Sequence, residues 1–398
     1  MTILEKAFIG GRRYWGWIAF LVAIIAVAGV LYLWQLSYGL AITGMSRDVT
    51  WGFYIAQMTF LVGVAASAVM VVGPYYLHHY KTFGRITILG EFLAVAAVTM
   101  CVLFVVVDLG QPSRALNVIL YFNPSSIMFY DFLVLSGYLL LNLVIGWFVL
   151  SAEAKSTTPP SWVRPLIYLS IPWAISIHTV TAFLYAGLPG RELWLTAIMA
   201  PRFLASAFAS GPSLLIILAL IVRRFTRFDP GVQAIQKLAS IVTYAMLANL
   251  FFVAMEFFTA FYSQIPGHMN GLSYLFFGLE GHSRLTPWMW TSMGLAVVAL
   301  ALLGVPATRK NEGIVGMAAA AIFIAAWIDK GIGLVVGGFI PNPLDEITEY
   351  SPTAPEVGIT LGVYALGFLI LTVLYRIATA VKEEVEVGSR SQLERIGG

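Results

Sequence analysis

Charged residues are scarce in this sequence. Only 11% of its 398 residues are Asp, Glu, Lys or Arg, whereas 59% are hydrophobic. Soluble domains have about 25% charged and about 45–50% apolar residues. Because a water-exposed surface requires more charge than this, the composition excludes an ordinary soluble globular protein. The net charge of +3 gives no indication of a nucleic-acid partner.

Cysteine and histidine are also scarce, which limits the metal chemistry available. Cys101 is the only cysteine, so the chain has no disulfide framework and cannot form a zinc or iron–sulfur site by itself. A haem within a helix bundle commonly takes two histidines at matched depth on facing helices. Of the five histidines only His178 falls well inside an apolar run; the others are His78, His79, His268 and His282. We therefore predict no haem, no iron–sulfur cluster and no bound metal.

Long apolar runs are what the sequence does contain, and we count ten. They lie near residues 15–36, 51–77, 86–108, 127–150, 164–187, 203–222, 238–262, 288–306, 313–336 and 357–380. Each has roughly the 20 residues that a helix needs to cross a hydrocarbon layer of about 30 Å, where every backbone group must be paired within the helix. The sequence therefore predicts an all-α integral membrane protein of about ten transmembrane helices.

Both ends of the chain carry charged residues outside the apolar runs. Lys6, Arg12 and Arg13 precede the first run as in a signal peptide. That run is too long for one, and no small-residue cleavage site follows, so we expect an uncleaved first helix. Residues 1–380 are predicted to form a single polytopic membrane domain, and the charged residues 381–398 a solvated cytoplasmic tail.

The distribution of lysine and arginine predicts the orientation. With these helix boundaries, 17 of the 23 basic residues fall on the N-terminal side of the membrane, and Lys330 lies within a helix. The five on the opposite side are Arg47, Arg114, Arg191, Arg202 and Arg284. Because cytoplasmic loops carry the excess of basic residues, both termini are predicted to be inside, in a cytoplasmic (inner) membrane.

The outer connections are longer than the inner ones and rich in Pro, Gly and aromatic residues. They are 37–50, 109–126, 188–202, 263–287 and 337–356. Long structured loops on one face commonly hold a binding site or a partner. We therefore expect the functional site on the outer, periplasmic side.

Ionisable residues within the helices gather toward that same side. Glu91 alone lies toward the inner surface; those toward the outer surface are Asp108, Asp131, His178, Arg202, Glu256, Asp329 and Lys330. A charge inside a membrane is costly and indicates function by default. Each of these residues also has a structural explanation that needs no function. Asp108 and Asp131 could be solvated helix ends, and Asp329–Lys330 could form ion pairs with other helices. Glu91 could reach the inner interface or pair with an arginine.

His178 is the strongest candidate for chemistry. It sits in Ile171–Tyr185, IPWAISIHTVTAFLY, away from both ends of its helix. A lone histidine is often only a packing residue. In lipid, however, a neutral imidazole could accept a proton from a quinol hydroxyl or donate one to a quinone carbonyl. Asp131, at similar depth on the preceding helix, could orient the ring and stabilise its charged form.

The segment Asp108–Asp131, DLGQPSRALNVILYFNPSSIMFYD, resembles the signature connection of the NrfD/PsrC family, the polysulfide-reductase-type membrane subunits. The resemblance extends to three further segments, Gly39–Val71, Leu188–Gly211 and Phe339–Glu356. Within the family the chain looks most like the membrane component of the complex associated with dissimilatory sulfite reduction. The resemblance covers essentially the whole chain.

The resemblance implies a fold and a function. The fold would be two four-helix bundles, from helices 2–5 and 6–9, with helices 1 and 10 outside. The function would be exchange of electrons between menaquinol or menaquinone and an external iron–sulfur protein, as a cofactor-free subunit that is not active alone. The quinone pocket would involve Asp131 and His178, with Asp108, Arg202, Glu256 and Glu91 as further quinone-binding or proton-path candidates.

The resemblance also implies partners. These would be an external ferredoxin-like iron–sulfur subunit, a multihaem cytochrome c, a haem b membrane subunit and a cytoplasmic iron–sulfur subunit. The alternative from another class is an ion or solute transporter. A transporter should show broken helices and charges near the membrane midplane. Here the charges bunch toward one face, which favours the redox hypothesis.

Overall fold

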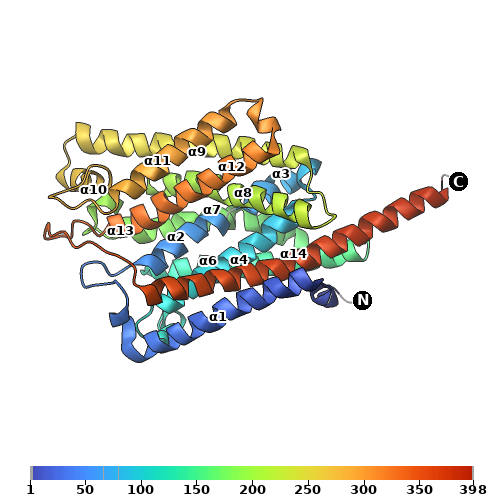
Figure 1. The fold of residues 1–398 in the computed structure, drawn as a ribbon, viewed down its shortest axis with the longest axis horizontal. Helices are drawn as coiled ribbons and strands as arrows, with labels where there is room; N and C mark the ends of the chain where they lie inside the picture. The colour runs from blue at the N-terminus through green and yellow to red at the C-terminus, as the bar shows by residue number, and fades with distance from the viewer. Residues whose placement is uncertain (1–2, 66, 79, 397–398) are drawn as a thin grey trace.

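The computed structural model describes residues 3–65, 67–78 and 80–396, with side chains up to residue 385. Over these residues the chain is helical and has no strand, apart from one isolated bridge between Leu279 and His282. Ten helices are long and apolar enough to cross a membrane. The predicted all-α, ten-span membrane fold is confirmed (Figure 1).

The ten spans lie along the long axis of the molecule (Figure 1). They are α1 (Arg12–Tyr38), α2 (Phe53–Ala65) with α3 (Val69–Leu77), α4 (Thr87–Asp108), α6 (Ile127–Ala154), α7 (Val163–Ala186), α8 (Met199–Phe225), α9 (Val232–Tyr262), α11 (Thr286–Gly304), α12 (Glu312–Ala326) with η7 (Trp327–Gly333) and α13 (Leu334–Gly337), and α14 (Ala354–Ile396). The connections contain the short helices η1 (Leu4–Phe8), η2 (Gly39–Ile42), η3 (Lys81–Phe83), η4 (Pro112–Arg114), α5 (Asn117–Leu120), η5 (Glu192–Trp194), α10 (Pro266–Phe276) and η6 (Thr308–Lys310).

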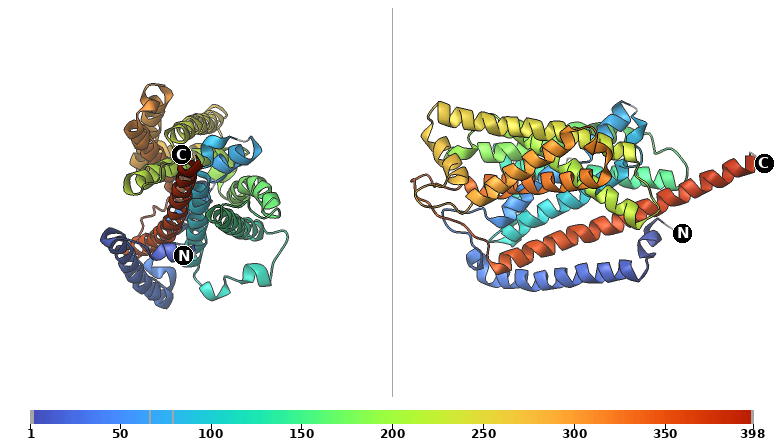
Figure 2. Two further views of the ribbon diagram at one scale, coloured as in Figure 1. Left: turned by 90° about the vertical axis from the view of Figure 1, so that its right-hand side faces the viewer. Right: turned by 45° about the horizontal axis from the view of Figure 1, so that its top comes forward.

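The spans pack as two bundles that meet along α2 and α8. One bundle contains α2/α3, α4, α6 and α7, and the other contains α8, α9, α11 and α12. The π-helical segment η7 also packs on α2, so the second and ninth spans touch across the junction. α1 lies along α14 outside the bundles, and α14 in turn packs on α4 (Figures 1 and 2). α1 buries only three of its side chains, because its apolar surface faces the lipid.

A buried carboxylate, Glu356, organises the outer end of this framework. It lies in the first turn of α14 and is fully buried. Its oxygens accept hydrogen bonds from the backbone N–H groups of Gly44 (3.0 Å) and Phe53 (3.2 Å), and from the Tyr350 hydroxyl. These contacts hold together the two loops that lead into α2 and α14.

Two spans are interrupted, which the apolar runs did not predict. In the second span residues 67–68, which precede α3, form a turn. The ninth span leaves α-helical geometry over Trp327–Gly333, where it forms a π-helix. Such segments are uncommon and occur mostly at functional positions. Hydropathy could not predict them, because both stretches stay apolar enough overall to qualify as spans, even though the π-helix contains Asp329 and Lys330.

The C-terminal residues continue the last span as a helix, and the cytoplasmic tail expected at residues 381–398 remains a prediction. α14 continues as one helix of 43 residues to Ile396 and projects beyond the bundles (Figure 1). Val381 and Lys382 are buried, and Lys382 Nζ donates to Glu153 Oε1 at 2.7 Å. This contact holds the first turn of the tail against α6. Residues 397–398 lie outside the described residues.

Candidate functional site

His178 is completely buried in α7, on the side that faces the interior. Neither ring nitrogen has a hydrogen-bond partner among the described residues. A buried donor or acceptor without a partner costs about 1–3 kcal/mol, and such groups are exceptions that call for an explanation. Neither nitrogen is therefore engaged by a described residue of the protein.

Asp131 lies on α6, and it forms no hydrogen bond with the His178 ring. Its Oδ1 accepts from the hydroxyl of Thr181 at 2.6 Å, one turn along α7 from His178. The expected direct orientation of the imidazole by Asp131 is thus wrong for this structure, because Thr181 occupies the carboxylate. Asp131 is also buried rather than solvated, with 6% of its surface exposed.

Above His178, toward the outer face, α7 continues into an aromatic cluster. Tyr185 is two turns further along α7 and shares a hydrogen bond with Thr59 of α2. Trp51 and Trp194 pack edge-on against the Tyr185 ring, with centroids 5.6 Å and 4.9 Å away. Tyr185 therefore lies on the same helix as His178 and contacts Trp51, a residue of the outer surface.

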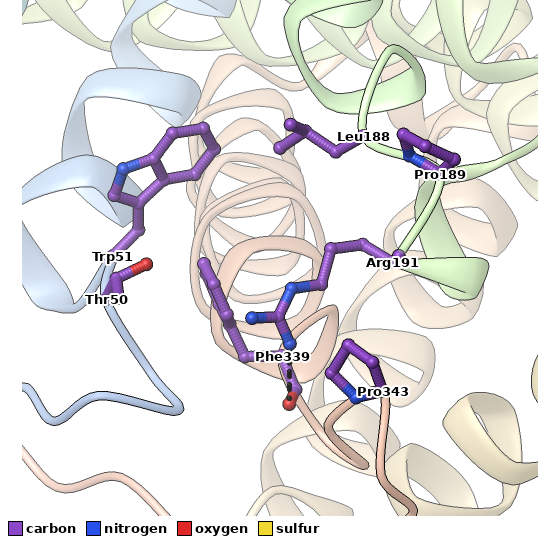
Figure 3. A pocket seen from close by; sticks show the side chains of 8 residues that line it. Thr50, Trp51, Leu188, Pro189, Arg191, Phe339 and Pro343 are labelled. Atoms are coloured by element: carbon purple, nitrogen blue, oxygen red, sulfur yellow. Dashed lines mark hydrogen bonds between the residues drawn. The ribbon is translucent and has the colours of Figure 1, made fainter.

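Trp51 also lines a pocket of about 330 Å³ on the outer side (Figure 3). This volume falls at the lower end of the range for small-molecule sites, about 300–1,000 Å³. The walls are mainly apolar, and they are formed by Thr50, Trp51, Leu188, Pro189, Gly190, Arg191, Phe339 and Pro343. Three outer connections contribute to them, so the site is built where the sequence placed its Pro-, Gly- and aromatic-rich loops.

Arg191 is the one charged residue of the pocket wall. Its guanidinium lies 4.3 Å from the centroid of the Phe339 ring and donates to the Phe339 carbonyl oxygen at 3.4 Å (Figure 3). Burial lowers the pKa of Arg191, and the charge of Asp48 partly opposes this. In the sequence Arg191 was only one of the outer basic residues, and its position over an aromatic ring was not predicted.

A second group of charges joins three helices of the other bundle. Arg202 of α8 pairs with Glu256 of α9 and donates to Asp329 Oδ1 of η7 at 2.7 Å. The expectation that Asp329 pairs with other helices is confirmed. Lys330, its neighbour, does not share this pairing. Its Nζ faces the Phe203 carbonyl oxygen at 3.4 Å and lies 4.2 Å from the centroid of the Phe203 ring.

Glu91 and Asp108 lie apart from both groups, at opposite ends of α4. Glu91 is buried, and neither carboxylate oxygen has a hydrogen-bond partner among the described residues. The expectations that it reaches the inner interface or pairs with an arginine are therefore wrong. It faces α6, where a methyl group added to Gly146 would lie 3.6 Å from Glu91 Oε2. Asp108 is half-buried, with Oδ1 shielded and unpartnered, so it is not a fully solvated helix end.

The buried polar groups do not converge as metal ligands do. No group of three or more His, Cys, Asp and Glu side chains in the described ranges could hold a metal ion. Helices long enough to span a membrane instead enclose the histidine His178, the carboxylate Asp131 and a group of buried charged residues.

These features define an integral membrane protein with ten candidate spans in the described residues and several buried polar groups between them. The family model of the polysulphide reductase NrfD matches residues 41–339, about three quarters of the sequence. The chain belongs to the NrfD family, and it is a membrane subunit of an NrfD-type oxidoreductase complex.

Three relatives extend this comparison over nearly the whole chain. A protein of Halobacterium salinarum, named provisionally as a membrane subunit of dimethyl sulfoxide reductase, is 26% identical and aligns over 89% of each chain. The Hdr-like menaquinol oxidoreductase integral membrane subunit of Archaeoglobus fulgidus is 23% identical over 93% of this chain and 94% of its own. A selenate reductase subunit of Mesobacillus selenatarsenatis is 22% identical over 92% and 94%.

Proposed function

We propose that this chain is the quinone-reactive subunit of a respiratory complex and exchanges electrons between menaquinol or menaquinone and an external iron–sulfur protein. The observation that carries this proposal is His178, a fully buried histidine whose two ring nitrogens have no hydrogen-bond partner among the described residues. An imidazole can take a proton from a hydroxyl or give one to a carbonyl. Quinol oxidation and quinone reduction require those two abilities.

The residues around His178 suit a quinone head group. That group is a flat ring carrying an oxygen at each of two opposite positions, so it needs apolar walls and hydrogen-bonding groups. The outer pocket supplies apolar and aromatic walls, and Arg191 is a donor at its edge. Trp51 and Tyr185 link this pocket to the helix that carries His178 and Thr181. We infer that the ring system binds between the pocket and His178.

Proton transfer is the part of the reaction that this chain performs. Quinol oxidation releases two electrons and two protons. In our proposal the neutral His178 imidazole takes one proton from a hydroxyl, and the Asp131 carboxylate is the acceptor for the second. The electrons leave for the external iron–sulfur partner. In the reverse direction the same two groups donate the protons.

Partners and substrate follow from the relatives and from the resemblance in sequence. The name of the Archaeoglobus fulgidus relative includes menaquinol, which supports menaquinol here. The resemblance to DsrP, the membrane component of the complex associated with dissimilatory sulfite reduction, supports a role in sulfite or sulfate respiration. It also supports the four partners: a ferredoxin-like iron–sulfur subunit, a multihaem cytochrome c, a haem b membrane subunit and a cytoplasmic iron–sulfur subunit. The basic inner loops support a site that faces the outer, periplasmic side.

A second candidate is an ion- or proton-translocating subunit without direct quinone chemistry. The two interrupted spans favour it, because transporters build their sites at broken helices. η7 holds the buried residues Asp329 and Lys330 at such an interruption. Asp108, Glu91, Arg202 and Glu256 would then belong to a proton path. A protein of this class would keep its activity without His178, which separates the two candidates.

The test is quinol oxidation by the purified complex, with a menaquinol analogue and an artificial external acceptor. The variant His178→Ala should lose at least about 100-fold in turnover, the usual contribution of a positioned proton acceptor. Its matched control is His78→Ala, because His78 is exposed at the inner end of α3. An unchanged thermal unfolding midpoint would show that the bundles are intact. Full activity of His178→Ala would refute the proposed site.

A further inference from the structure

The connection between α4 and α6, residues 109–126, exposes a run of large apolar side chains. Their exposed fractions range from 45% to 79%, and they are Leu116, Ile119, Leu120, Tyr121 and Phe122. The first three are spaced three and four residues apart around the short helix α5, so they share one side of it. A contiguous apolar patch of this kind marks a contact with lipid or with protein.

The connection begins level with the outer end of α1. Gln35 Nε2, in the last turns of α1, donates to the Val107 carbonyl oxygen of α4 at 2.6 Å. A methyl group added to Gly110 would lie 3.6 Å from Leu40 Cδ1, just beyond the end of α1. These two contacts place the start of the connection beside the point where α1 ends.

Exposed aromatic side chains mark this level as the membrane interface. Trp34 and Tyr38 are exposed on the last turn of α1, and Tyr130 is exposed on the first turn of α6. Trp and Tyr concentrate where lipid tails meet headgroups, because an aromatic ring with one polar edge suits both environments. Interfacial aromatic residues thus flank the connection at both of its ends.

The apolar patch continues into the exposed surface of α6. The Phe122 ring lies against the ring of Phe129, with centroids 5.3 Å apart, and Phe129 in turn lies against Tyr130 at 5.5 Å. Leu133 and Leu140, further along α6, are also exposed. In a membrane-spanning helix such a surface faces the lipid tails, so the patch is continuous with a lipid-facing surface.

The connection also lies to the side of the bundles. The left view of Figure 2 looks along the spans and shows it looping out beside them. The outer pocket is formed by other connections, and no residue of 109–126 lines it. The patch is therefore placed over the lipid that surrounds the bundles and not over the pocket.

The charge of the connection suits a phospholipid surface. Arg114 is its only charged residue, and it is exposed. The other four outer connections each contain at least one Asp or Glu; they are 37–50, 188–202, 263–287 and 337–356. A guanidinium group binds phosphate well, and the absence of acidic residues avoids repulsion by anionic headgroups. Apolar side chains combined with a basic one are what membrane-surface segments use.

We propose that residues 112–122 form an interfacial anchor, whose apolar side chains enter the adjoining lipid leaflet while Arg114 binds a phospholipid phosphate. The anchor holds the outer ends of α4 and α6 at a fixed depth in the membrane. It would bind lipid whether or not His178 reacts with quinol, so the two proposals can fail independently.

The test uses the full chain in vesicles of phosphatidylethanolamine and phosphatidylglycerol, with a nitrobenzoxadiazole label on Leu120→Cys. The matched control is Leu344→Cys, because Leu344 is 73% exposed against 69% for Leu120 but is followed by Asp345 in another outer connection. The unsubstituted chain is the blank, because its only cysteine, Cys101, is buried. We expect the label at position 120 to emit at shorter wavelength than the label at 344. Phosphatidylcholine with a nitroxide near its headgroup should quench only the label at 120.

Water-like emission from the Leu120→Cys label, without quenching by the lipid nitroxide, would overturn the anchor. The same measurement on the purified complex separates lipid from a protein occupant. Quenching by lipid in both samples supports the proposal. A label that is shielded only in the complex belongs to an interface with another subunit, and the proposal then fails. Should Leu120→Cys not fold, Tyr121→Cys gives the same test, because Tyr121 is 79% exposed.

The role of the charge is tested by adding Arg114→Lys or Arg114→Glu to the labelled Leu120→Cys chain. Lysine keeps the positive charge, so lipid quenching should be retained. Glutamate is repelled by phosphatidylglycerol, so quenching should fall, and it should fall less in vesicles of phosphatidylcholine alone. Equal quenching in all three chains would show that Arg114 does not bind a lipid phosphate.

Discussion

The Thr181 hydroxyl donates a 2.6 Å hydrogen bond to Asp131, from the turn of α7 that follows His178. The same hydroxyl also lies 2.8 Å from the Ile177 carbonyl oxygen, so it can switch between two acceptors. Asp131 forms no hydrogen bond with the His178 ring, and neither ring nitrogen of His178 has a hydrogen-bond partner among the residues that the structure describes. This feature makes the histidine a candidate for chemistry.

Replacing Thr181 with valine tests this relationship. Valine has nearly the same shape but no hydroxyl, so the buried Asp131 carboxylate would lose its donor at a cost of about 1–3 kcal/mol. We expect quinol oxidation by the complex to slow by about 10-fold, with little change in KM. Thr181→Ser restores the hydroxyl and should restore the rate. Equal rates for valine and threonine would show that the hydrogen bond has no part in turnover.

The ion cluster of the second bundle should contribute strongly to stability. In Arg202→Met the buried carboxylates of Glu256 and Asp329 lose their shared cation. Breaking a buried pair in this way costs about 3–5 kcal/mol, and the thermal unfolding midpoint of the detergent-solubilised protein should fall clearly. The control is Arg223→Met at the inner surface, where Arg223 and Glu312 are about one quarter exposed. There we expect a loss of about 0–1 kcal/mol, and a larger loss than in Arg202→Met would contradict the assignment.

The outer loops should loosen in acid because of Glu349. Its Oε1 accepts the Arg284 backbone N–H at 2.9 Å, and its Oε2 lies 3.6 Å from His282 Nδ1. Partial burial acts to raise the pKa of Glu349. The hydrogen bonds from Arg284 and His282, together with their charges, outweigh burial and lower the pKa overall.

A lowered pKa means that the ionised form of Glu349 stabilises the folded loops. This contribution is fully present above the unfolded value of about 4.3, and it is lost as the pH falls through the lower folded value. The hydrogen-exchange protection factors of residues 279–284, which correct for the intrinsic pH dependence of amide exchange, should therefore fall below about pH 4 and stay constant between about pH 5 and 7. Glu349→Gln should show lower protection factors between about pH 5 and 7 and lose the dependence. A wild-type pH profile in that variant would rule out Glu349 as the tether.

The ninth span can be tested by labelling, because its π-helix makes it the least regular of the ten. A reporter placed after Arg309 should be cytoplasmic, and one placed in the 342–355 loop should be external. The span between them is long enough to cross the membrane only if α12, η7 and α13 are continuous through it. Finding both reporters on one side would mean that Glu312–Gly337 does not cross.

The sequence alone was sufficient for the architecture. Apolar runs of about 20 residues predicted ten spans, because a helix in lipid has no other way to pair its backbone groups. The segment from Asp108 to Asp131 indicated the NrfD family, and the comparisons confirm that membership. Orientation follows from the basic residues of the loops and stays a prediction until it is labelled. These properties depend on composition and local pattern, which a linear sequence carries completely.

Only the tertiary structure decided which polar groups meet. The sequence placed Asp131 and His178 at similar depth, but Thr181 takes the carboxylate through a contact that depends on how α6 and α7 are rotated. The sequence prediction treated Asp329 and Lys330 together as residues that form ion pairs with other helices. In the structure both lie in the π-helix, where Asp329 pairs with Arg202 and Lys330 lies at the junction of the two bundles. Glu91 was expected to find a partner and has none among the described residues. Hydropathy records how deep a residue lies, whereas the direction of a side chain is fixed by packing between helices that are distant in sequence.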